Sequence, residues 1–160
     1  MMKLFRLDKR LLTGMALIDE QHRQYGKFVN AFLKVCQKHD HVAEGALRKA
    51  FTFLHVYARQ HLQEEAALME TYAYPGRVEH LERHHFFSAW IDQTEVQLAN
   101  GSTSVEHLMK IHYMLVEWFK MHIRSEDRKL TDYLKEVAEK RQDSYLLNLI
   151  RDAFSPSPRR

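Results

Sequence analysis

Cysteine, glycine and proline are all scarce in this sequence. The 160 residues include one cysteine, Cys36, so no disulfide can form within the chain. A single thiol suits a reducing compartment, and we expect a cytoplasmic protein. The five glycines and three prolines stand mostly at the joints between longer segments, a distribution that favours helices over strands and turns.

Long apolar runs and concentrated charge are also missing. No stretch is long and apolar enough to span a bilayer, and the first residues lack the apolar core of a signal peptide. The net charge of +3 comes from basic residues that are interleaved with acidic ones. We therefore expect a solvated surface without a nucleic-acid interface. The length indicates one domain, which we expect to be a monomer.

Apolar residues recur with helical periodicity in four long segments, and each segment ends at a recognisable break. The expected helices cover residues 17–38, 42–72, 77–99 and 103–139, with Thr103 and Glu106 as a capping box at the start of the last one. This pattern predicts an all-α fold, an antiparallel up-and-down four-helix bundle over residues 15–140. Residues 1–14 would form an N-terminal arm. Residues 141–160 would form a C-terminal extension with a short helix at 144–154 and a disordered tail.

Histidine is the abundant residue, with eleven copies, and it is the commonest metal ligand in proteins. Positions three, four and seven apart share one face of a helix. By this rule each of the four predicted helices places histidine on its apolar stripe. The stripes carry His22 in the first helix, His61 and Glu65 in the second, His80 and His84 in the third, and His122 in the fourth.

A single histidine on an apolar stripe usually needs no more than a hydrogen-bond partner, and one HxxxH pair is expected by chance. Five histidines and a carboxylate in one core are different, because burying so many polar groups without strong partners is costly. Metal ions can neutralise such a set inside a helical bundle. Imidazole and carboxylate without a thiolate cluster suit iron, zinc or copper, and the number of candidate ligands suits two ions. For a carboxylate after His122, helical periodicity favours Glu126 over Asp127, which lies about 140° around the helix.

The arrangement resembles the hemerythrins, specifically the single-domain bacterial kind, over roughly residues 13–134. The similarity rests on a combination of short motifs, none of which is specific alone. They are Asp19-Glu20-Gln21-His22, His61 to Glu65 followed by Leu68-Met69, Tyr74-Pro75, His80 and His84 with Phe87, and Trp118-Phe119 followed by His122-Ile123 and Asp127.

The resemblance implies a site with two iron ions and an oxo or hydroxo bridge. His80, His84 and His122 would hold one iron, and His22 and His61 would hold the other. Glu65 and Asp127 would bridge the two ions. Dioxygen would bind reversibly at the iron with two histidines, in a dry pocket formed by Trp118, Phe119 and Ile123. The protein would then store, deliver or sense oxygen, and it would not be an enzyme.

Two departures from the family pattern concern this pocket. The family usually has a tryptophan in the arm, where this chain offers only Phe5 and Leu7, and it commonly has leucine at the position of Phe119. Other functions on the same scaffold remain open, namely an iron- or nitric-oxide-handling stress protein and a di-iron oxidase. The ferritin-like oxidases use paired Glu-x-x-His motifs, and this sequence has one such pair, Glu82 and His85, off the stripe.

Overall fold

The computed structural model describes residues 4–38, 44–100 and 104–151, and within these ranges every regular element is a helix and none is a strand. The all-helical prediction is therefore confirmed for the described residues. The elements are α1 (Ala16–Lys38), α2 (Glu44–Thr71), α3 (Arg77–Ala99), α4 (Val105–His122), the π-helix η1 (Ile123–Asp127), α5 (Arg128–Arg141) and α6 (Ser144–Arg151). The predicted third helix has these same bounds, and the predicted start of the second, Val42, lies outside the described residues.

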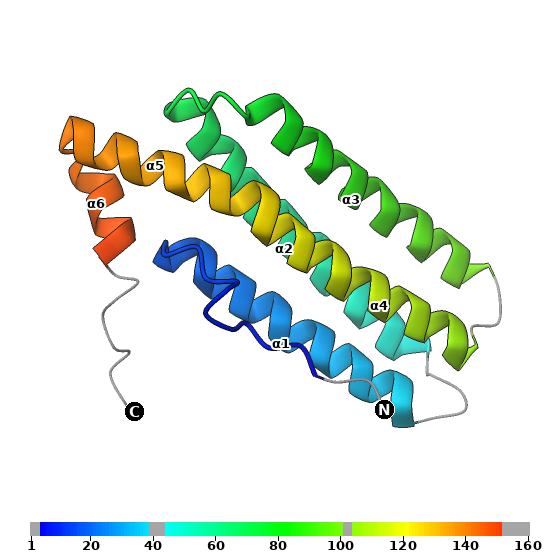
Figure 1. Cartoon of the computed structure of the whole chain (residues 1–160). Helices are drawn as coiled ribbons and strands as arrows, with labels where there is room; N and C mark the ends of the chain where they lie inside the picture. The colour runs from blue at the N-terminus through cyan, green and yellow to red at the C-terminus, as the bar shows by residue number, and fades with distance from the viewer. Residues whose placement is uncertain (1–3, 39–43, 101–103, 152–160) are drawn as a thin grey trace.

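The long helices lie lengthwise beside one another, and α4, η1 and α5 follow one another as a single rod (Figure 1). Helix α1 packs against α2 and α4, and α2 packs against α3. The interior contains two apolar clusters. One includes Tyr25, Phe87 and Phe119, and the other includes Ile18 and Leu130. On α1, His22 stands between Ile18 of one cluster and Tyr25 of the other, so a polar layer separates the two apolar ones.

The fourth predicted helix differs from the structure in two ways. Its N-cap is Ser104, whose hydroxyl accepts a hydrogen bond from the backbone of His107, so the prediction of Thr103 as the cap was wrong by one residue. The helix is also not regular throughout. At η1 the backbone N–H of Arg128 bonds to the carbonyl of Ile123, five residues earlier, which widens one turn of the rod.

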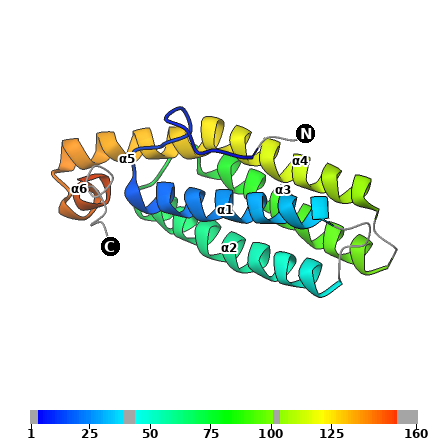
Figure 2. The same cartoon turned by 90° about the horizontal axis from the view of Figure 1, so that it is seen from below.

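The N-terminal arm runs between α1 and the rod of α4, η1 and α5 (Figure 2). Phe5 and Leu11 are buried, whereas Leu4 is exposed. The backbone of Phe5 exchanges two hydrogen bonds with the Asn30 side chain, at 2.7 and 2.9 Å. The close approach requires glycine at position 26, because a Cβ there would lie 2.9 Å from the Phe5 ring. The sequence predicted an arm, and the structure shows that it completes the core.

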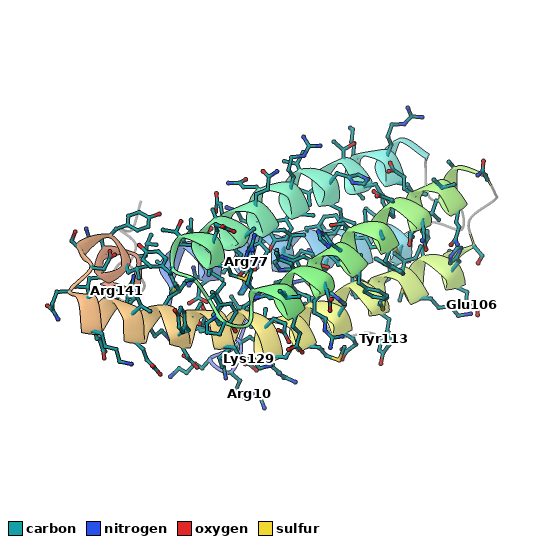
Figure 3. All side chains as sticks on the ribbon, turned by 90° about the horizontal axis from the view of Figure 1, so that it is seen from above. Arg10, Arg77, Glu106, Tyr113, Lys129 and Arg141 are labelled. Carbon is teal, nitrogen blue, oxygen red and sulfur yellow. The ribbon has the colours of Figure 1, made fainter. Side chains whose placement is uncertain are left out.

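At the other end, α6 packs on α5 and α1 and buries Leu146 (Figures 1 and 2). The predicted helix at 144–154 is described as far as Arg151, and the tail predicted to be disordered lies outside the described residues. Charged side chains such as Arg10, Glu106 and Arg141 lie on the periphery (Figure 3). Among the described residues, no helix combines the length and the apolar character that crossing a bilayer requires.

Candidate metal centre

Seven buried side chains from four helices and the π turn converge in the polar layer between the apolar clusters. Their ligand atoms form two groups, within each of which all atoms lie within 4.8 Å of one another, and Asp127 belongs to both. The first, the three-histidine group, consists of Glu65, His80, His84, His122 and Asp127. The second, the two-histidine group, consists of His22, His61 and Asp127. The structure thus brings together all seven residues that the sequence analysis singled out as candidate ligands.

The two carboxylates connect the groups. Asp127 Oδ1 lies 2.9 Å from His122 Nε2, and its Oδ2 lies 3.0 Å from His22 Nε2. Glu65 Oε2 lies 3.2 Å from the Nε2 atoms of His80 and His84, and 3.8 Å from that of His61 in the other group. Each carboxylate therefore faces imidazoles of both groups, which is the position that a bridging ligand of two ions occupies.

The polar atoms of these residues lack ordinary partners, and this observation tests whether a metal fits. Among the described residues, no hydrogen bond satisfies either carboxylate oxygen of Glu65 or Asp127, nor either ring nitrogen of His22 or His80. His84 and His122 even bring their Nε2 atoms within 3.0 Å of each other. Buried polar groups normally find partners, so this many unmet ones mark a place where cations supply the missing interactions. The donor set of imidazole and carboxylate, without thiolate, suits iron, zinc or copper.

Asp127 reaches the site because of the π turn. In a regular α-helix, the fifth residue after His122 would point about 140° away from it. The wider turn at η1 contains one more residue, so Asp127 returns to the face of His122, and its side chain is fully buried. Glu126, which regular periodicity favours, is also buried but belongs to neither group, and its carboxylate lies 3.9 Å from Lys129.

Gln21 is a functional residue that the sequence analysis quoted without a role. Its side-chain carbonyl lies 2.7 Å from His61 Nδ1, and its amide donates to Glu64. A donor hydrogen on His61 Nδ1 leaves Nε2 with its lone pair toward Glu65 and the site. The sequence offered one clue to this role, because Gln21 directly precedes His22 in the motif. Helical periodicity did not indicate it, because adjacent residues of an α-helix lie on different faces.

The buried environment moves the pKa values of the ligands in opposite directions. Burial lowers the pKa of His61 to about 4, although Glu65 attracts its charged form. Burial also acts on His80, but the carboxylates of Asp127 and Glu65 outweigh it and raise the pKa of His80 to about 10. Burial acts to raise the pKa of Asp127, yet the neighbouring histidines, His122 first, hold it well below its usual range. Without metal the site would therefore keep its carboxylates ionised and a proton on His80, which a metal cation would displace.

The three residues predicted to form an oxygen pocket do not all face the same group. The Phe119 ring meets the His22 ring edge-on at 5.2 Å, on the two-histidine side. The Trp118 ring instead stacks on His122 at 4.6 Å, on the three-histidine side, and on Phe87 at 3.7 Å. Ile123 is fully buried in the apolar cluster that contains Phe119.

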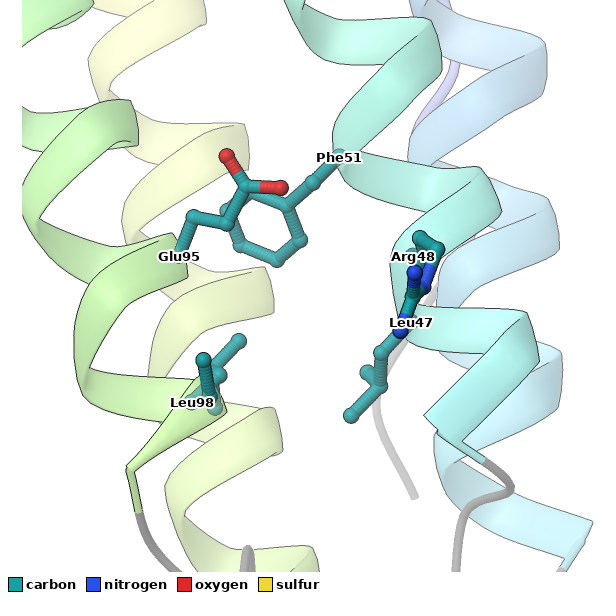
Figure 4. A pocket seen from close by; sticks show the side chains of 6 residues that line it. Leu47, Arg48, Phe51, Glu95 and Leu98 are labelled. Atoms are coloured by element: carbon teal, nitrogen blue, oxygen red, sulfur yellow. The ribbon is translucent and has the colours of Figure 1, made fainter.

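Surface hollows approach the three-histidine group from two directions. One, of about 250 Å³, lies between α2 and α3 and includes His84 in its lining. Another, of about 690 Å³, includes Trp118 and His122. A third hollow, of about 210 Å³, lies between the start of α2 and the end of α3 and is lined mainly by apolar side chains with Arg48 and Glu95 (Figure 4). It contains none of the seven candidate ligands, so we assign it no part in the metal centre.

The remaining predictions concern residues outside the two groups. Glu82 and His85, the Glu-x-x-His pair typical of ferritin-like proteins, are exposed and take no part in the site. His112, predicted at the edge of the core stripe, is buried but belongs to neither group. Cys36 is buried as expected, and burial raises the pKa of its thiol to about 11, which disfavours reactive thiolate.

Comparison with known proteins gives the family. The model of the hemerythrin HHE cation binding domain matches residues 13–134. The bacteriohemerythrins of Pseudomonas paraeruginosa (strain DSM 24068 / PA7) and Pseudomonas aeruginosa (strain LESB58) are each 24% identical to this chain over 149 residues. These alignments cover 90% of this chain and 94% of each relative. The family match spans most of the chain and includes all seven candidate ligands, so the chain belongs to the hemerythrin family.

Proposed function

We propose that this protein binds dioxygen reversibly at a non-haem centre of two iron ions, and that it stores, delivers or senses oxygen without acting as an enzyme. The observation that carries the proposal is the asymmetric pair of ligand groups that share Asp127. Three histidines and two carboxylates would nearly complete the coordination of one ion. Two histidines with the bridging carboxylates would leave room for a ligand at the other. Two ferrous ions held in this way would supply the electrons for reversible oxygen binding.

The protein's own residues would orient the metals and keep the site dry. Asp127 and Glu65 would bridge the ions, and Gln21 would fix the ring of His61 through its 2.7 Å contact. Phe119, Tyr25 and Phe5 form an aromatic cover over the two-histidine side, with ring centroids 4.0 Å apart for Phe119 and Tyr25 and 5.6 Å apart for Phe119 and Phe5. Such a cover excludes water and protons, and this favours release of unchanged oxygen over its reduction.

We also propose that the four helical rods form an antiparallel up-and-down bundle. The turn of residues 72–76 between α2 and α3 is too short to carry the chain back along the bundle. Tyr133 fastens this turn by donating a hydrogen bond of 2.8 Å to the carbonyl of Tyr72. In this arrangement α1 to α4 would each contribute at least one ligand to the same level of the bundle, with Asp127 from η1.

The deciding experiment combines metal analysis with absorption spectroscopy on the purified protein. We expect two irons per chain, and an absorption band that appears when the reduced protein meets air and disappears when oxygen is removed. A stoichiometry near one iron, or zinc after expression with ample iron, would contradict the two-ion site. Two irons with irreversible oxidation on the first exposure to air would instead refute oxygen carriage and favour an oxidase.

A further inference from the structure

Tyr57 is a buried tyrosine beside the two-histidine group. It lies on α2 one helical turn before His61, its side chain is 93% buried, and its ring stacks on that of His61 with centroids 5.4 Å apart and planes 23° from parallel. Its hydroxyl has no hydrogen-bond partner among the described residues. A buried hydroxyl without a partner is costly, so a group of this kind calls for an explanation.

The neighbouring Tyr25 shows what a structural hydroxyl looks like in this core. The two rings lie 5.2 Å apart, and Tyr25 is fully buried as well. The Tyr25 hydroxyl, however, donates a hydrogen bond of 3.1 Å to the carbonyl of Leu115. The two tyrosines of this cluster thus differ in their hydroxyl groups. That of Tyr25 makes a hydrogen bond within the fold, and that of Tyr57 makes none among the described residues.

The ring that carries the unused hydroxyl lies next to the two-histidine group, the one with fewer candidate ligands. Tyr57 contacts His61 and Tyr25, Tyr25 contacts Phe119, and Phe119 contacts His22, so these rings surround the two-histidine group. Burial raises the pKa of Tyr57 well above its ordinary value, and the charges of Asp127 and Glu65 add to the shift.

We propose that Tyr57 is the hydrogen-bond donor of the ligand pocket, whose hydroxyl bonds to an oxygen or nitrogen atom of a small ligand held at the two-histidine metal. The inference rests on the proposed function and adds a specificity-determining residue to it. A phenol donates one hydrogen and is protonated at neutral pH. It would retain ligands that accept a hydrogen bond, such as dioxygen or azide, and would retain carbon monoxide much less. Phe119 and Phe5 offer no donor, and the Tyr25 hydroxyl is taken up by the Leu115 carbonyl, so Tyr57 would decide which small ligands stay.

The test compares Tyr57→Phe with Tyr25→Phe, which removes a hydroxyl of the same chemistry that the fold uses. The first measurement is the unfolding midpoint of the metal-free proteins. We expect Tyr57→Phe to leave the midpoint unchanged or raise it, because no protein hydrogen bond is lost. Tyr25→Phe should lower the midpoint, because it leaves the Leu115 carbonyl without its donor.

The second measurement is azide binding to the oxidised, iron-loaded proteins, together with oxygen release from the reduced ones. Loss of one hydrogen bond should weaken azide binding and speed oxygen release by roughly three- to tenfold in Tyr57→Phe, with iron content unchanged. The control for these two measurements is Tyr133→Phe, which removes a hydroxyl that bonds to the Tyr72 carbonyl away from the aromatic cover, and it should stay within twofold of the parent protein in both. Unchanged azide affinity and oxygen release in Tyr57→Phe would overturn the inference.

A fall of the metal-free midpoint in Tyr57→Phe as large as that in Tyr25→Phe would also overturn it, because a buried water would then be the partner of the hydroxyl. Failure of the proposed function looks different. It would appear in the parent protein as the absence of reversible oxygen binding. Azide affinity would still show whether Tyr57→Phe weakens ligand binding at the metal.

Discussion

The two ligand groups share a carboxylate and yet lie in different surroundings. The three-histidine group faces Trp118, which stacks on His122, and surface hollows reach two of its histidines. The two-histidine group lies under Phe119, Tyr25 and Tyr57, and the arm places Phe5 on top of Phe119. One half is therefore rich in ligands and near the surface, and the other has fewer ligands and a thick aromatic cover.

Under the proposed function, this difference would separate two tasks within one bundle. A metal held by more donors can tolerate water nearby, because its coordination leaves little room for a further ligand. A metal with an open position needs a dry pocket, because water and protons would compete with the ligand that it is meant to bind. Three histidines would serve the first task, and the buried rings of Phe5, Tyr25, Tyr57 and Phe119 would serve the second.

The largest effect should come from Asp127, the residue that both groups share. Asp127→Ala removes a ligand atom from each group and leaves five buried histidines around Glu65, so we expect iron to fall from two per chain to near zero. The loaded protein should lose stability as well, because metal binding to the folded form contributes to folding.

Glu126→Ala is the matched control, since it removes a buried carboxylate of the same π turn that belongs to neither group. It should retain both irons. Metal analysis after identical expression decides the matter, and the assignment fails if Glu126→Ala loses the iron while Asp127→Ala keeps it.

The second-largest effect should be a pH dependence of the stability of the metal-free protein, in which the two ligand groups act in different pH ranges. His80, with a raised pKa of about 10, contributes stability that is fully present below its unfolded pKa near 6.5 and is lost as pH rises toward 10. His61, with a lowered pKa of about 4, resists protonation in the folded state, so stability falls as pH drops from about 6.5 toward 4. Asp127, whose pKa is depressed, adds a further loss at lower pH.

Denaturant unfolding of the metal-free protein should therefore give a maximum of the unfolding free energy near pH 6.5, with a fall on both sides. The iron-loaded protein should lack the alkaline fall that His80 causes, because a bound metal keeps its imidazole deprotonated at neutral and alkaline pH. A metal-free stability that rises steadily from pH 7 to 9 would show that His80 carries no proton between the carboxylates.

The sequence predicted those parts of the site that follow a regular helix. His22, His61, Glu65, His80, His84 and His122 all lie on apolar stripes because their spacing of three, four or seven residues matches the α-helical period. Asp127 could not be found in this way, because the π turn at η1 changes the local period, and only the family spacing indicated it. The contact of Phe5 with Phe119 and the role of Gln21 depend on how separate segments pack, which periodicity within one helix does not contain.

A smaller effect should follow from removing the hydrogen-bond partner of a histidine in the two-histidine group alone. Gln21→Ala removes the partner of His61 Nδ1, and loss of such a partner typically reduces metal affinity by about 10- to 100-fold. We expect a chelator to remove one iron per chain faster than from the parent, with the second iron released more slowly. Glu20→Ala is the control, because its exposed carboxylate pairs only with Arg23 at 3.1 Å in the described structure. Equal acceleration for both irons would mean that Gln21 supports the whole centre.

The smallest effect on stability, and the sharpest test of the aromatic cover, is Phe119→Leu. Phe119 is 1% exposed and stands between His22, Tyr25 and Phe5, so Phe119→Ala should cost roughly 3–5 kcal/mol through the cavity that it opens. Leucine fills most of that space and restores the residue that the family commonly has, so the fold and both irons should be retained.

The matched control for this substitution is Phe87→Leu, which changes an equally buried ring on the Trp118 side. We expect Phe119→Leu to change the rates of oxygen release and of autoxidation, because it thins the cover over the open position. Phe87→Leu should leave both rates near those of the parent. Stopped-flow oxygen release and the decay of the oxygenated spectrum measure these rates. If the two variants behave alike, the aromatic cover acts as ordinary core packing, and the contrast between the halves lies in their ligands alone.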